Sequence, residues 1–92
     1  MIYVIVRRRF HTTPETITIF RETYNTEKEA VRTARADYRK LKRKLNETTA
    51  SDANRYFDMY QFDCYGVDTG KIYADWRIVA VTKFDAEELL NA

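Results

Sequence analysis

An unbroken amphipathic pattern over residues 27–45 is the feature that most constrains the fold of this chain. The segment contains neither glycine nor proline, so no residue in it interrupts an α-helix. At about 100° per residue, its apolar side chains fall within one sector of the helix. That sector consists of Ala30, Val31, Ala34, Tyr38, Leu41 and Leu45. A helix with a single apolar stripe must pack that stripe against another layer, which the rest of the chain has to supply.

The residues around this segment supply signals for a helix start and for a second, short helix. Thr26 and Glu29 have the spacing of a capping box, in which the Thr26 hydroxyl accepts from the backbone N–H of Glu29. Asn46 is a plausible stop. Residues 84–89 predict a short C-terminal helix with Asp85 as its cap.

Four segments rich in β-branched and aromatic residues predict strands: residues 2–10, 16–24, 55–67 and 71–83. A short turn around Pro14 joins the first two as an antiparallel hairpin, and a turn at Gly70 precedes the last. For residues 55–67 the aromatic density favours a strand, and a helix is the alternative over residues 55–65. Residues 46–54 are polar and predict a loop.

These elements predict one α+β domain that spans residues 1–92, since a chain of this length forms a single core. Its element order is ββαββ followed by the short helix. The simplest packing is a four-stranded antiparallel sheet with the long helix across one face. The other face would then be available to a partner, and a homodimer could hide it.

Basic residues form a second row on the long helix, centred about 120° from the apolar sector. Half of the chain's sixteen Lys and Arg lie between residues 27 and 45, although the formal net charge is only +2. The row consists of Lys28, Arg32, Arg35, Arg39, Lys42 and Arg43. Its spacing could follow a phosphate backbone, whereas the plainer interpretation is a solvated helix face.

The tentative binding residues of the sheet are Arg7, Arg9, Tyr73 and Arg77. Alternation sends Arg7 and Arg9 to one face of the first strand. We expect that face to be the uncovered one, where both could pair with carboxylates of neighbouring strands, with a phosphate or acidic-partner site as the alternative. Tyr and Arg are common at the centres of protein interfaces.

Catalytic and metal chemistry have little support in the sequence. His11 is the only histidine and Cys64 the only cysteine, without the spacing of metal ligands. Both glycines lie near one turn, so no glycine-rich phosphate loop is present. We therefore expect no enzyme activity, no cofactor and no metal.

The compartment can be anticipated from cysteine usage and hydropathy. A single cysteine precludes an intrachain disulfide, which fits a reducing environment. The first apolar run is shorter than that of a signal peptide and precedes its charges, and no apolar run could cross a membrane. We expect a cytoplasmic protein without a membrane partner.

The outline of hairpin, "TEKEA" helix start and second hairpin resembles short accessory proteins of phages and mobile elements, small anti-CRISPR proteins among them. The resemblance implies a compact, non-catalytic protein that binds a larger machine and blocks or redirects it. The leading hypothesis is a module that acts by protein–protein interaction. The alternative is a nucleic-acid-binding protein that uses the basic helix row.

Overall fold

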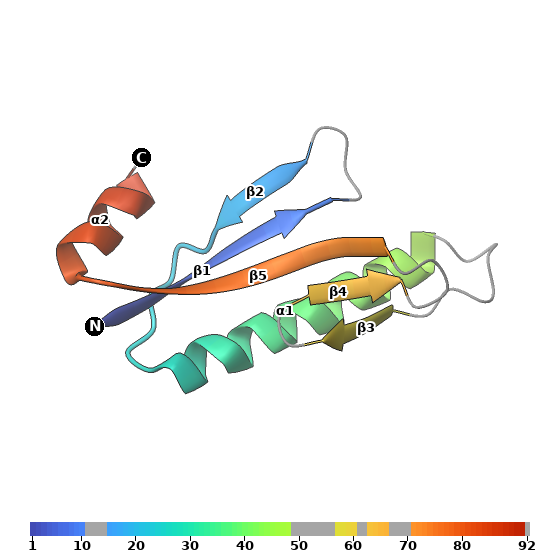
Figure 1. Cartoon of the computed structure of the whole chain (residues 1–92), viewed down its shortest axis with the longest axis horizontal. Coiled ribbons are helices and arrows are strands. Elements are labelled where there is room, and N and C mark those ends of the chain that lie inside the picture. Colours follow the sequence, from blue (N-terminus) through green and yellow to red (C-terminus); the bar gives the residue numbers. More distant parts are fainter. Residues whose placement is uncertain (11–14, 49–56, 61–62, 67–70, 92) are drawn as a thin grey trace.

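The computed structural model describes residues 1–10, 15–48, 57–60, 63–66 and 71–91, which form an antiparallel sheet and two helices (Figure 1). The elements are β1 (Ile2–Arg9), β2 (Thr16–Ile19), α1 (Glu27–Thr48), β3 (Phe57–Tyr60), β4 (Asp63–Gly66), β5 (Lys71–Val81) and α2 (Lys83–Asn91). The predicted α+β class, long helix and short C-terminal helix are confirmed. The sheet order is β2-β1-β5-β4-β3, so the first and last strands of the chain lie side by side at its centre.

The sheet has five strands, one more than predicted, because the segment expected to be a single strand reverses direction. β3 and β4 pair as an antiparallel hairpin in which Tyr60 lies opposite Asp63. Side chains alternate in the same way in β3 and in β4, so the sequence pattern had the appearance of one longer strand. The helix alternative for this segment is wrong for its described residues.

β2 is shorter than the strand predicted over residues 16–24. Phe20 still donates its backbone N–H to the carbonyl of Ile5 (2.9 Å), and Tyr24 rejoins β1 by exchanging two backbone bonds with Tyr3. Residues 20 and 24 are four apart, whereas their partners 5 and 3 are two apart. The two extra residues cannot fit the ladder and leave it.

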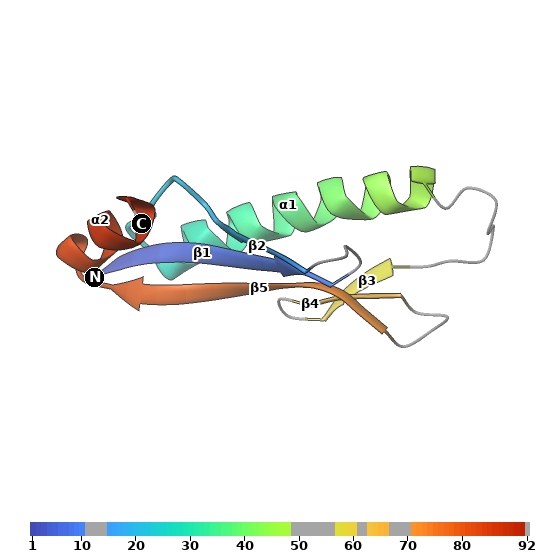
Figure 2. The ribbon, with the colours of Figure 1, turned by 90° about the horizontal axis from the view of Figure 1, so that it is seen from above.

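α1 lies along one face of the sheet (Figure 2). All members of its predicted apolar sector are buried except Val31, which is half-buried. They pack on Ile5, Cys64, Ala74 and Trp76, and Trp76 is only 1% exposed. The ring of Tyr38 meets that of Trp76 edge-on, with centroids 6.1 Å apart. We call this the covered face of the sheet and the opposite one the reverse face.

Both helices are capped by the threonine that directly precedes them. The backbone N–H of Glu29 donates to Oγ1 of Thr26 at 3.2 Å, which confirms the predicted cap of α1. For α2 the predicted cap was wrong, because the helix begins at Lys83, before Asp85. Oγ1 of Thr82 accepts from the backbone N–H of Asp85 at 3.1 Å and takes that role.

Candidate functional site

The basic row predicted on α1 forms a continuous exposed surface, which we call the basic stripe. Its members are Lys28, Arg32, Arg35, Arg39, Lys42 and Arg43. All are exposed except Lys42, which is half-buried and holds its Nζ 5.9 Å from the centre of the Tyr38 ring. The packing of the opposite side of α1 on the sheet holds the stripe outward.

Carboxylates of the described residues leave the basic stripe unneutralised. The ion pairs of the described part of the chain that involve arginine are made by Arg7, Arg8 and Arg77, none of which belongs to the stripe. A hollow of 230 Å³ opens on the stripe, lined by Lys28, Val31, Arg32, Arg35 and Arg39. The stripe therefore has both the positive charge and the surface hollow needed to receive an anionic group.

Arg7 lies on the covered face of the sheet, whereas we expected it on the uncovered face. Its Nη1 donates to Oδ2 of Asp37 on α1 at 2.7 Å, and Nε1 of Trp76 donates to the same oxygen at 2.8 Å. The side chains of Arg7 and Asp37 are each less than one-fifth exposed. This cluster connects β1, β5 and α1, so Arg7 is committed to holding the helix on the sheet.

Arg9 shares the covered face with Arg7 by the alternation of β1, which again differs from the expectation. Burial lowers the pKa of the Arg9 guanidinium, the neighbouring charge of Arg7 lowers it further, and Asp37 raises it. The predicted set Arg7, Arg9, Tyr73 and Arg77 is thus divided between the two faces of the sheet. β1 is apolar on both sides at Val4 and Ile5, so its sequence could not tell which face the helix covers.

The reverse face carries an aliphatic row that is only partly hidden. By the registers of β1 with β2 and β5, this row consists of Ile2, Val4, Val6, Ile17, Ile19, Val79 and Val81. Val4 is fully buried, Ile17 is 66% exposed and Val79 39% exposed, while the other four are half-buried. Such a contiguous row on a sheet face is unusual for a surface that meets only water.

Charged and aromatic groups border the aliphatic row. Arg8 bonds Asp75 at 3.1 Å, and its guanidinium lies over the ring of Phe10, 4.5 Å from the centroid. Arg77 is 72% exposed along its side chain and reaches the same carboxylate at 4.0 Å. Tyr73, predicted for the binding face, is half-buried and packs against the hydrophobic core. An apolar centre with an arginine rim has the composition of a protein interface.

Sequence reasoning missed two parts of this arrangement. Asp37 was not among the predicted site residues, although its angular position next to the apolar sector points it toward the sheet. The aliphatic row was missed because its members lie on three strands. The alternation of Ile17 and Ile19 was visible, but not the face to which they belong.

Comparison of the chain with protein-family models, with curated proteins and with solved structures finds no match. Within the described residues, no helix combines the length and apolar character needed to span a membrane. The same part of the chain gathers no group of three side chains that could hold a metal ion. The case for function therefore depends on the two surfaces, the basic stripe and the reverse face.

Proposed function

We propose that this chain is a small, non-catalytic binding module that acts by protein–protein contact through the reverse face of its sheet. The observation that carries the proposal is the exposed aliphatic row centred on Ile17 and Val79, bordered by Arg8 and Arg77. Covering such a row removes apolar surface from water, at about 25 cal/mol per Å². The bordering guanidinium groups would give the contact its orientation.

The resemblance of the outline to short accessory proteins of phages and mobile elements suggests a finer form of this function. In that class, a compact protein binds a larger machine and inhibits it, as small anti-CRISPR proteins do. We propose this phage-type inhibition as the finer form of the function, in the cytoplasm of the host cell. Its support is the combination of small size and one large, mixed apolar and cationic surface.

The test compares three immobilised proteins in a lysate of the source organism: the wild type, Ile17→Asp and Phe84→Asp. Ile17 and Phe84 are exposed to nearly the same extent, 66% and 67%, but Phe84 lies on α2. A protein identified by mass spectrometry would then be purified and its binding measured directly. We expect Ile17→Asp to weaken this binding at least tenfold and Phe84→Asp to leave it unchanged, with circular dichroism of all three alike.

Equal binding of a purified partner to the wild type and to Ile17→Asp would contradict the use of the reverse face. Loss of that binding in a variant of the basic stripe, with Ile17→Asp unaffected, would transfer the contact to α1.

Nucleic-acid binding through the basic stripe is the second candidate function, favoured by six cations on one side of a helix without carboxylate partners among the described residues. From Lys28 to Arg43 the stripe extends over about 22 Å at 1.5 Å per residue. Each phosphate that it neutralises would release counterions.

Gel-shift titrations with single- and double-stranded DNA and RNA test this candidate. If all six cations engage phosphates, affinity falls about a thousand-fold between about 50 and 200 mM salt. The variant Arg35→Glu with Arg39→Glu should abolish binding, whereas Arg21→Glu with Lys40→Glu, which changes the net charge equally at exposed positions outside the stripe, should largely retain it. Absence of binding at the lower salt concentration would reject the candidate.

A further inference from the structure

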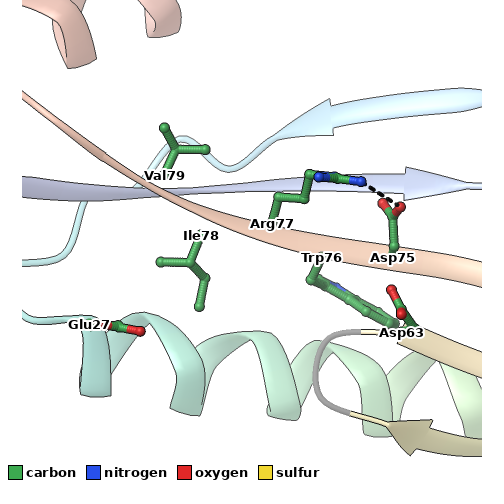
Figure 3. A pocket seen from close by; sticks show the side chains of 7 residues that line it. All are labelled: Glu27, Asp63, Asp75, Trp76, Arg77, Ile78 and Val79. Carbon is green, nitrogen blue, oxygen red and sulfur yellow. Dashed lines mark ion pairs between the residues drawn. The ribbon is translucent and has the colours of Figure 1, made fainter.

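Among the described residues, one side of β5 pairs with no strand over its last five residues, which we call the open edge (residues 77–81). β4 pairs with β5 only between Lys71 and Asp75, while β1 pairs with it up to Val81. Among the described residues no other strand adjoins this stretch. A groove of 460 Å³ lies against it, between Glu27 at the start of α1 and Asp63 at the start of β4 (Figure 3).

The hydrogen-bonding groups of the open edge follow from the register with β1. Phe10 donates its backbone N–H to the carbonyl of Tyr73, and β5 runs on without a register shift against β1 to Val81. Odd-numbered residues of β5 therefore direct their N–H and C=O groups toward β1, and even-numbered residues direct them to the other side. At the open edge, Ile78 and Ala80 present two donors and two acceptors.

Natural sheets usually protect such an edge with proline, a bulge or an inward-pointing charge. The sequence of residues 77–81 is RIVAV, in which Arg77 is the only charge and points to the reverse face. α2 packs on the other side of β5, near Ile2, Arg21 and Thr23 (Figure 1), and the first half of α1 lies across the groove from the edge (Figure 3). An edge of this composition is suited to accept another strand.

We propose that the open edge pairs antiparallel with the open edge of a second copy of this chain, about a two-fold axis at Val79. In this register, residues 77–81 of one copy lie opposite residues 81–77 of the other. Ile78 exchanges two backbone bonds with Ala80 of the second copy, and the symmetric pair gives two more. The pairing joins the two sheets through their β5 strands, with β4 of each copy remaining on the same edge beside Lys71–Asp75.

Side-chain size favours this register over its neighbours. It puts Val79 opposite Val79 and large Ile78 opposite small Ala80. A shift of the axis to residue 77 would oppose two arginines, and a shift to residue 80 would leave only residues 79–81 of the open edge facing each other. A shift to residue 78 would bring in Asp75, whose other side already adjoins β4.

The first test is the mass in solution from micromolar to millimolar protein concentration, by size exclusion with light scattering. We expect a concentration-dependent species of twice 11.0 kDa. Ala80→Pro should return the protein to a monomer, because it removes an N–H that faces away from β1. Ala80→Thr retains that N–H and should remain dimeric. A monomer at every concentration, or a dimer that survives Ala80→Pro, would overturn the proposal.

Disulfide trapping tests the register. In a non-hydrogen-bonded antiparallel pair, two Val79→Cys residues would have Cα atoms about 4.5 Å apart, within disulfide range. Oxidised glutathione, which accepts the two electrons, should therefore cross-link Val79→Cys. Arg77→Cys is the matched control, because its two copies would lie about 13 Å apart along the strands. Cross-linking of Arg77→Cys instead, or of the wild type through buried Cys64, would refute the axis at Val79.

The dimer and the proposed function share Val79 and Arg77, but the dimer depends on backbone groups of the open edge and the proposed function on the side chains of the reverse face around Ile17. Ile17→Asp should leave the dimer intact, and Ala80→Pro should leave a monomer with its reverse face available. The two proposals can therefore fail separately.

Discussion

The indole N–H of Trp76 and the Oδ2 oxygen of Asp37 are 2.8 Å apart and join β5 to α1. The same oxygen accepts from Nη1 of Arg7, so one carboxylate oxygen connects three elements that are distant in the sequence. The carboxylate is less than one-fifth exposed, which makes its two donors costly to leave unsatisfied. We expect the attachment of the helix to the sheet to be most sensitive to change at this point.

Asp37→Ala should lower the free energy of unfolding by about 2–4 kcal/mol, because it leaves the guanidinium of Arg7 and the indole N–H without their acceptor. Asp37→Asn retains an oxygen for Trp76 but loses the charge, and should cost about half as much. Urea unfolding followed by the fluorescence of Trp76, the only tryptophan, measures both. Equal midpoints for Asp37→Ala and the wild type would show that the cluster contributes nothing to stability.

Arg7 and Arg8 are neighbours in sequence on opposite faces of β1, which provides a matched pair of variants. Arg7→Met should destabilise the fold by about 2–3 kcal/mol, since Asp37 would remain covered and without its cation. Arg8→Met should cost less, about 1–2 kcal/mol, because Asp75 is only 10% exposed but Arg8 is 39% exposed and Arg77 still approaches the carboxylate at 4.0 Å. Thermal unfolding of both variants checks the order, and the reverse order would contradict the assignment of the two faces.

Ile5 and Ile17 have the same side chain in opposite environments. Ile5→Ala should cost about 2–5 kcal/mol, because Ile5 is buried between α1 and the sheet and its loss leaves a cavity. Ile17→Ala should remain within about 0.5 kcal/mol of the wild type, since the side chain is mostly exposed. Denaturant unfolding distinguishes these outcomes. A large cost at Ile17 would mean that a second copy or another element covers the reverse face under the conditions used.

Thr26→Ala should destabilise the protein by about 1 kcal/mol, because it removes the acceptor for the backbone N–H of Glu29 at the start of α1. Thr26→Ser keeps a hydroxyl at this position and is the control. Helical circular dichroism and urea unfolding together measure the effect. An equal loss in both variants would assign the cost to the methyl group of Thr26 rather than to the cap.

Much of the local structure could be predicted from sequence because its signals are local. The helix period of α1, its Thr26 cap and the strand character of the segments around Ile5 and Trp76 each depend on residues close in sequence. The basic stripe was identified correctly as a row on α1 by the same logic. Its exposure followed once the opposite side of the helix was known to be apolar. What the stripe binds stays a prediction.

The chain direction within the segment containing β3 and β4 could not be predicted in this way. Side chains alternate in both strands of a hairpin, so the sequence pattern did not indicate that Tyr60 and Asp63 lie opposite each other. The early end of β2 has a similar origin. Residues 20 and 24 are four apart, whereas their partners on β1, residues 5 and 3, are two apart, so regular pairing cannot continue between the two contacts.

The sequence by itself determined which segments are helical or extended and which residues share a side of each, because these are properties of the helix and strand periods. Only the tertiary structure decided which side of β1 faces α1, that Asp37 receives both Arg7 and Trp76, and where β5 lacks a neighbour. Those features depend on the registers between strands far apart in the chain. A shift of one residue in a register would exchange the two faces without altering any local pattern.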